Sequence, residues 1–149
     1  MTSPRPCSAL VGSPPDLRDL GGAGLTIGKT FTFEAAHRLN GLPDGHKCGR
    51  RHGHSYQVTV ELTSDELVGP GFVTDFGDLA PFAAYLAEHL DHRDLNEVLT
   101  VEPTSEHLAV HLARWFLDNV QPGIPGRLVA VTVSETSKTW ARCTVGNVA

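Results

Sequence analysis

Two stretches of regular alternation between apolar and polar residues constrain the fold of this chain most. In the first, residues 25–37, mainly aromatic and aliphatic side chains occupy one face and mainly threonines the other. In the second, residues 52–62, a face of Tyr, Val and Leu side chains begins with two histidines, His52 and His54. A period of two residues is typical of half-buried strands. Only the polar loop 40–51 separates the two stretches, so we expect them to pair antiparallel.

The middle of the chain changes to helical spacing, with apolar residues every three or four positions over 79–90 and again over 104–120. Asp75 precedes the first of these segments in an acid-rich helix start, and Thr104 or Ser105 can cap the second. Both segments are therefore predicted to be amphipathic helices.

Two further alternating stretches, residues 128–135 and 139–145, complete the pattern. The order of two strands, two helices and two strands predicts an α+β fold, a four-stranded antiparallel sheet with both helices on its apolar face. We expect one domain over residues 24–149. Residues 1–23 contain four of the ten prolines and are expected to form a flexible arm.

The composition argues against several classes of protein. The net charge of −5 does not favour binding to nucleic acid, and no apolar run approaches the ~20 residues of a membrane span. The three cysteines, Cys7, Cys48 and Cys143, are far apart, so a disulfide framework is not expected. The start of the chain lacks the pattern of a secretory signal. We therefore expect a cytoplasmic protein without nucleic-acid or membrane partners.

Three of the eight histidines are predicted to converge. His52 and His54 lie two positions apart on a strand, so they point to the same side with Cα atoms about 7 Å apart. His37 ends the preceding strand on its apolar face, and antiparallel pairing brings it beside the other two. Three imidazoles with an open fourth position are typical of a catalytic zinc ion. The alternative is that each histidine is a hydrogen-bonded core residue.

Cys48 lies four residues before His52, in a segment that also contains Lys47, Arg50 and Arg51. Two roles are open for its sulfur atom. It could be the fourth ligand of a closed zinc site, or a thiolate, favoured by the nearby positive charges, that accepts a proton beside the metal. The basic residues, Arg50 in particular, could bind an anionic substrate such as a phosphate ester, or they could be ordinary solvated charges.

Two acidic residues are further candidates. Asp91 precedes His92 after the first helix, and a carboxylate beside an imidazole can orient it and stabilise its charged form, although such pairs also occur simply where helices end. Glu135 shares a strand face with the valines of residues 129–133. An unpaired buried carboxylate is costly. Glu135 should therefore accept hydrogen bonds, either from an internal donor or from the N–H groups of a bound ligand.

Five short motifs, taken together, resemble the 6-pyruvoyl-tetrahydropterin synthase family over about residues 25–145. They are Ala36-His37-Arg38, Cys48-x-x-x-His52-Gly53-His54, Leu90-Asp91-His92-x-x-Leu95-Asn96, Pro103-Thr104-Ser105-Glu106 and Ser134-Glu135-Thr136. The three residues between the cysteine and the His-Gly-His motif are similar to the spacing of the bacterial branch, the 6-carboxy-5,6,7,8-tetrahydropterin synthases.

The resemblance implies the tunnelling fold, in which the four-stranded sheets of several protomers join into an oligomeric barrel with active sites at subunit interfaces. It implies a homo-oligomeric carbon–carbon lyase. The implied reaction converts 7,8-dihydroneopterin triphosphate to 6-carboxy-5,6,7,8-tetrahydropterin with release of triphosphate and acetaldehyde, an early step of queuosine-type 7-deazapurine biosynthesis. A sibling reaction on the same substrate, with a pyruvoyl product, and a non-catalytic zinc-binding assembly are the alternatives.

The resemblance also implies roles for individual residues. The Zn²⁺ ligands would be His37, His52 and His54. The groups that move protons would be Cys48, Asp91 and His92. The residue that holds the pterin would be Glu135, with Glu106 as a second candidate.

Overall fold

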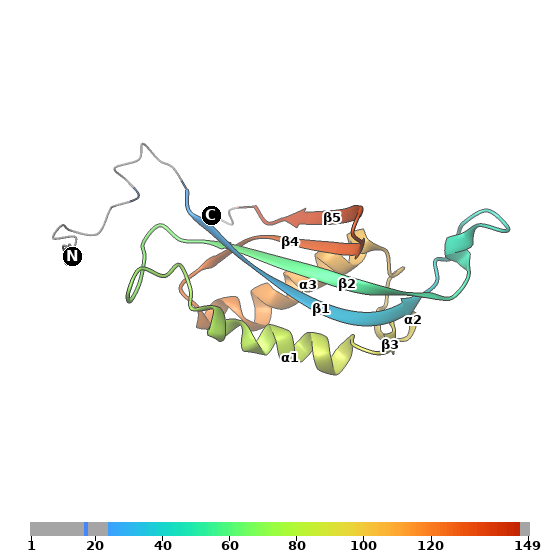
Figure 1. Ribbon diagram of the computed structural model, residues 1–149, viewed down its shortest axis with the longest axis horizontal. Coiled ribbons are helices and arrows are strands. Elements are labelled where there is room, and N and C mark those ends of the chain that lie inside the picture. The colour runs from blue at the N-terminus through green and yellow to red at the C-terminus, as the bar shows by residue number, and fades with distance from the viewer. Residues whose placement is uncertain (1–16, 18–23, 147–149) are drawn as a thin grey trace, which may run out of the picture.

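The computed structural model describes Leu17 and residues 24–146 of the chain. In this region two helices, α1 (Ala80–His89) and α3 (Ser105–Asn119), cover one face of a β-sheet (Figure 1). The arm predicted over residues 1–23 lies outside the described residues, apart from Leu17. None of the helices in the described region is long and apolar enough to cross a membrane.

The four long strands pair antiparallel, as predicted for the sheet. The antiparallel neighbours are β1 (Thr26–His37) with β2 (His52–Thr63), β2 with β4 (Arg127–Thr136), and β4 with β5 (Thr139–Thr144). The structure differs from the expected four-stranded sheet by one element. The two-residue strand β3 (Arg93–Asp94) pairs in parallel with the outer edge of β1, which gives a five-stranded mixed sheet of order β3-β1-β2-β4-β5. A strand of two residues has no detectable period, so the sequence pattern did not predict it.

The connecting segments also contain short helices that the periodicity did not show. They are the 3₁₀ turns η2 (Lys47–Gly49), η3 (Phe76–Leu79) and η4 (Gln121–Gly123) and the single-turn helix α2 (Leu95–Val98).

The predicted Thr104 cap begins α3 directly, whereas Asp75 caps the turn before α1 rather than α1 itself. The side chain of Asp75 accepts a hydrogen bond from the backbone N–H of Gly77 at 2.8 Å, and so caps the 3₁₀ turn that leads into α1. The hydroxyl of Thr104 accepts one from the N–H of His107 at 3.1 Å. Thr104, rather than Ser105, is therefore the N-cap of α3.

The hydrophobic core lies between the helices and the covered face of the sheet. Phe82 of α1 meets Phe31 of β1 and Phe116 of α3 edge to face, with ring centroids 5.1 and 5.5 Å apart. The side chains of Phe82 and Phe116 have no exposed surface. Because one ring contacts both a strand and the other helix, a single apolar layer joins the two helices to the sheet.

A β-bulge changes which residue of β4 faces this core. Leu62 of β2 pairs with Leu128, but the preceding residue, Glu61, pairs with Ala130, so Val129 is the extra residue. Val129 is only half-buried, whereas Leu128 is buried. The apolar strand face that was expected to run from Val129 to Glu135 therefore begins at Val131.

Replacing Phe116 with alanine is expected to lower the free energy of unfolding by about 3–5 kcal/mol, because the substitution leaves a cavity in the shared apolar layer. Denaturant-induced unfolding monitored by circular dichroism measures this loss. Val110 lies on the same helix with 45% of its surface exposed, and V110A is the matched control. Equal losses in the two variants would contradict the burial of Phe116.

Candidate metal centre and active site

The three predicted histidines converge at the point where β1 ends and β2 begins. His37 and His52 are directly opposite each other in the strand register, and His54 lies two residues further along the same face. Ligand atoms of the three rings all lie within 4.8 Å of one another. His37 is buried and the other two are half-buried. Within the described residues, this is the one group of three or more potential ligands that could hold a metal ion.

Backbone carbonyl groups orient two of these rings. The Nδ1 atom of His37 lies 2.7 Å from the carbonyl oxygen of Pro103, and that of His52 lies 2.6 Å from the carbonyl oxygen of Arg50. A carbonyl oxygen only accepts hydrogen bonds, so Nδ1 carries the proton in each ring. The Nε2 atom is then the nitrogen of each ring that can offer a lone pair. Outer hydrogen bonds of this kind are typical of metal-binding histidines.

The Nε2 atoms lack the partners that they require. Those of His37 and His52 lie 3.1 Å apart, so their lone pairs repel unless a proton or cation lies between them. The buried Nε2 of His54 has no hydrogen-bond partner in the described part of the chain. An unsatisfied buried polar atom costs about 1–3 kcal/mol. A cation bound by all three nitrogens would remove both penalties, so the residues present fit a metal ion.

Glu135 lies beside the three histidines. Its carboxylate oxygens are 3.9 Å from His37 Nε2 and 3.8 Å from His54 Nε2, and its side chain is 24% exposed. Both distances are too long for a hydrogen bond, so neither histidine is the internal donor considered for this carboxylate. The register between β4 and β5 shifts at this point, and such bulges often redirect a side chain next to an active site.

Burial sets the protonation of the half-buried ring. It lowers the pKa of His54, while the negative charge of Glu135 acts in the opposite direction and the neighbouring His37 and His52 lower the pKa further. The balance favours neutral His54, which is the form that can bind a metal ion.

Tyr56 is a neighbour of the cluster that the sequence pattern assigned only to the strand face. Its hydroxyl lies 3.3 Å from Nδ1 of His37, and its side chain is fully buried. Burial, and secondarily the charge of Glu135, raise the pKa of Tyr56, so the hydroxyl stays protonated. The sequence did place Tyr56 on the same strand face as His54, two residues further along. An aromatic residue at that position is equally typical of the core, so the pattern alone could not assign it to the site.

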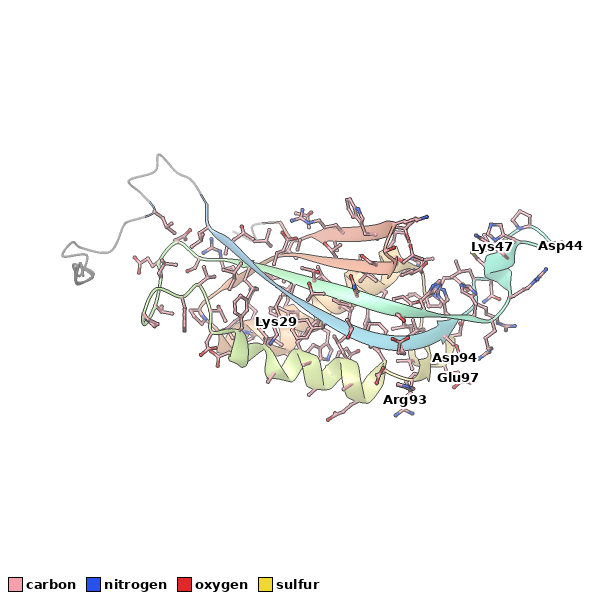
Figure 2. All side chains as sticks on the ribbon, viewed as in Figure 1. Lys29, Asp44, Lys47, Arg93, Asp94 and Glu97 are labelled. Atoms are coloured by element: carbon pink, nitrogen blue, oxygen red, sulfur yellow. The ribbon has the colours of Figure 1, made fainter. Side chains whose placement is uncertain are left out.

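Cys48 lies outside this cluster. Its N–H donates to Nδ1 of His46 at 3.1 Å, and its carbonyl accepts from the N–H of Leu39 at 2.8 Å. Among the described residues, the group of ligand atoms within 4.8 Å of one another does not include its sulfur, so Cys48 is not a fourth ligand in this structure. The loop that carries it projects beyond the ends of β1 and β2, with Asp44 and Lys47 near its tip (Figures 1 and 2).

The basic residues around Cys48 have different surroundings. Arg51 forms an ion pair with Asp94, which lies at the end of the sheet nearest this loop (Figure 2). Lys47 and Arg50 are exposed, and within the described region no ion pair or hydrogen bond of their side chains is found. The structure therefore leaves two positive charges on the loop available to solvent or to an anion.

Asp91 and His92 form a pair at the outer edge of β1. Nδ1 of His92 lies 3.0 Å from the Asp91 carboxylate, whose other oxygen accepts from the N–H of Glu34 at 2.8 Å. The N–H of His92 donates to the carbonyl of Glu34 at 2.6 Å. His92 has a φ of 56°, a left-handed conformation that is unfavourable for a residue with a side chain and is held here by these contacts.

Within one chain the predicted site residues do not come together in a single group. The His92 side chain is 79% exposed, and no hydrogen bond or ion pair among the described residues joins it or Asp91 to Cys48 or to the three histidines. Glu106 is exposed in the first turn of α3, three residues after Pro103, and contacts none of the other candidates through a hydrogen bond or ion pair in the described region.

Comparison with known proteins identifies the family. The sequence profile described as 6-pyruvoyl tetrahydropterin synthase matches residues 26–145. The chain belongs to the 6-pyruvoyl tetrahydropterin synthase family. It is 42% identical over 122 residues to the 6-carboxy-5,6,7,8-tetrahydropterin synthase of Synechocystis, an alignment that covers 78% of this chain and 90% of that protein. A putative 6-carboxy-5,6,7,8-tetrahydropterin synthase of Archaeoglobus fulgidus is 34% identical over 117 residues, with 78% and 93% covered.

A solved structure of the same family gives the same fold. The 6-pyruvoyl tetrahydropterin synthase of Caenorhabditis elegans is 26% identical, with a TM-score of 0.71 over 83% of this chain and 97% of that one. Together these matches confirm the predicted family and fold class, and they confirm that this member of the 6-pyruvoyl tetrahydropterin synthase family is a pterin-processing lyase.

Replacing His54 with alanine is expected to lower the affinity for the bound metal ion at least about tenfold, because one of three converging nitrogens is lost. Plasma mass spectrometry of the purified protein, before and after dialysis against a weak chelator, measures the metal per chain. The exposed His89 on α1 is the control position, and H89A should retain the metal. Full retention of the metal by H54A would rule out the three-histidine site.

The carboxyl group of Asp91 is expected to have a pKa below its ordinary value of 3.8, because the N–H of Glu34 and the His92 ring stabilise the charged form. The charged Asp91 therefore stabilises the fold at pH values above the pKa that this group has in the unfolded chain. This stabilisation is lost as the pH falls through the lowered pKa of the folded protein. In H92A the pKa of Asp91 should rise only part of the way back to its ordinary value, because the hydrogen bond from Glu34 is the larger cause of the shift and is retained. Carbon-detected NMR titration measures both values, and an unchanged pKa in H92A would show that the pair does not form.

Proposed function

We propose that the chain is a zinc-dependent 6-carboxy-5,6,7,8-tetrahydropterin synthase, which converts 7,8-dihydroneopterin triphosphate and one water molecule to 6-carboxy-5,6,7,8-tetrahydropterin, triphosphate and acetaldehyde. The observation that carries this proposal is the convergence of His37, His52 and His54 beside Glu135, in a chain that is 42% identical to a protein of that name. Three neutral imidazoles suit Zn²⁺. When bound there, the ion would supply Lewis acidity toward the side-chain oxygens of the pterin and so acidify the neighbouring C–H bond.

Proton transfer is assigned to groups outside the metal cluster. Cys48 accepts the proton from the acidified carbon, and His92, with Asp91 supporting its charged form, moves protons while the side chain is cleaved. The pair of His92 and Asp91 is supported by their 3.0 Å contact and by the exposure of the His92 ring, which leaves it accessible to a substrate.

Substrate binding is assigned to charged residues at two places. Glu135 accepts hydrogen bonds from the amino and ring N–H groups of the pterin, and its carboxylate oxygens are too far from His37 and His54 to be used by them. Glu106, exposed in the first turn of α3, is a second pterin contact. Arg50 binds the triphosphate, supported by its exposure on the Cys48 loop.

Within one chain, Cys48 and His92 are separated from the three histidines. This separation supports an active site that is formed by residues of two subunits. The loop between β1 and β2, which contains Cys48, projects beyond the ends of both strands (Figure 1). His92 lies at the edge of β1, where its N–H donates to the carbonyl of Glu34. A homo-oligomer can bring such a loop or edge of one copy to the metal cluster of another. The product would be a precursor of 7-deazapurines, and the enzyme would act in the cytoplasm.

One specific observation bears on the alternatives. The sulfur of Cys48 is not part of the metal-binding group, which argues against a closed, purely structural zinc site. The sibling reaction, with a pyruvoyl product from the same substrate, is retained as the second candidate because the chain shares the fold of the C. elegans 6-pyruvoyl tetrahydropterin synthase.

Incubation of the purified metal-bound protein with 7,8-dihydroneopterin triphosphate is expected to yield 6-carboxy-5,6,7,8-tetrahydropterin and acetaldehyde, which mass spectrometry and an aldehyde assay detect. C48A should keep its metal and lose at least about 100-fold in kcat, because proton transfer by a positioned side chain contributes at least that much. Cys143 on β5 is the matched cysteine, and C143A should remain active.

Three outcomes would contradict the assignment. A pyruvoyl product without acetaldehyde would favour the sibling reaction. Loss of metal together with the fold in C48A would indicate a closed Cys-His site. Absence of any product from the metal-bound wild-type protein would exclude the proposed activity.

A further inference from the structure

Two side chains from the segment between β3 and α3 hold the chain where it leaves β1. The side chain of Asn96 accepts from the N–H of Arg38 at 2.8 Å and donates to the carbonyl of the same residue at 2.9 Å. Glu102 accepts two hydrogen bonds from Asn40, one from its backbone N–H at 3.0 Å and one from its side-chain amide at 2.9 Å. We call this contact between Glu102 and Asn40 the Glu102 clamp. Two parallel hydrogen bonds fix orientation as well as distance.

The Glu102 clamp lies next to the backbone that holds Cys48. Leu39, between the two held residues, donates its N–H to the carbonyl of Cys48 at 2.8 Å. β1 ends at His37, so this part of the chain has no strand partner and its geometry depends on these contacts. A displacement of Asn40 would therefore be transmitted through one peptide unit to Cys48.

The same turn also orients a metal ligand. Pro103 follows Glu102 directly, and its carbonyl oxygen lies 2.7 Å from Nδ1 of His37. The carbonyl of Glu102 in turn accepts from Nδ1 of His107 in the first turn of α3 at 2.8 Å, so the turn is tied to the helix. The backbone hydrogen bond from Asn40, and after it the side-chain hydrogen bond from the same residue, lower the pKa of Glu102 and keep its carboxylate charged.

We infer that Glu102 is a positioning residue, which sets the place of Cys48 relative to the metal ligand His37 by holding Asn40. The role in turnover rests on the proposed function, because it takes Cys48 as the proton acceptor. The clamp itself can be measured without turnover, through the reactivity of the Cys48 thiol.

A reciprocal exchange tests the clamp. N40D places two carboxylates opposite each other, which removes one hydrogen bond and adds repulsion. In the double variant N40D/E102Q, the new glutamine amide can donate to the new aspartate while its oxygen still accepts from the backbone N–H of residue 40, so two hydrogen bonds are restored. The readouts are the rate of Cys48 alkylation by iodoacetamide, resolved by peptide mass spectrometry, together with metal content, kcat and KM.

We expect N40D to change the alkylation rate of Cys48 about tenfold, since the contact is charge-assisted, and to lower kcat more than KM changes. The double variant should return within about twofold of the wild type, with the metal retained throughout. D65A is the control, because Asp65 makes a similar two-bond contact, to Arg127, that involves none of the site residues. It should leave the alkylation rate unchanged.

An unchanged alkylation rate in N40D would overturn the inference, as would a changed rate that the double variant does not restore. The product assay on the wild-type protein tests the proposed function independently of the alkylation rates. If the wild-type protein forms no product, the proposed reaction is excluded. The alkylation rates of the variants would still decide whether Glu102 positions Cys48.

Discussion

The register between β1 and β2 determines both the core and the three-histidine cluster. The two strands pair over their full length, with His37 opposite His52 at one end and Thr26 opposite Thr63 at the other. A shift of one residue would move every side chain of a strand to the other face. The alternation that buries the aromatic and aliphatic residues of the sheet therefore also places the three histidines on one side. Their convergence needs no special loop, because it is a consequence of the same pairing that forms the core.

Orientation of the rings depends instead on segments outside the sheet. The carbonyl of Arg50 comes from the loop before β2, and that of Pro103 comes from the turn before α3. Each leaves an Nε2 lone pair directed at the other rings, which is the state that a metal ion requires. Because Pro103 directly precedes α3, the packing of this helix on the sheet helps to fix the orientation of the His37 ring.

Period and spacing along the sequence predicted the four long strands, both long helices, the Thr104 cap of α3 and the three-histidine cluster, each of which the structure confirms. They could not predict β3, because two residues have no period, or the bulge at Val129, because a bulge is a property of a strand pair. Tyr56 was indistinguishable from a core residue. Glu102 was missed because its contact with Asn40 spans 62 residues of sequence. The roles of Cys48, His92 and Glu135 remain predictions.

The distribution of these groups over the chain limits how the chemistry can take place. A proton acceptor must lie within hydrogen-bond reach of the proton that it removes, directly or through one water molecule. In the described part of one chain, the three histidines lie on the core face of the sheet, and the loop that contains Cys48 projects beyond the ends of β1 and β2 (Figure 1). His92 lies beside Glu34 of β1 with its side chain 79% exposed. The left-handed backbone of His92 is held by its hydrogen bond to the carbonyl of Glu34 and by the contact of its ring with Asp91, so the exposed ring has a fixed place beside β1. In the proposed homo-oligomer, this ring would be in place for a site that a second copy completes, without any rearrangement of its own backbone.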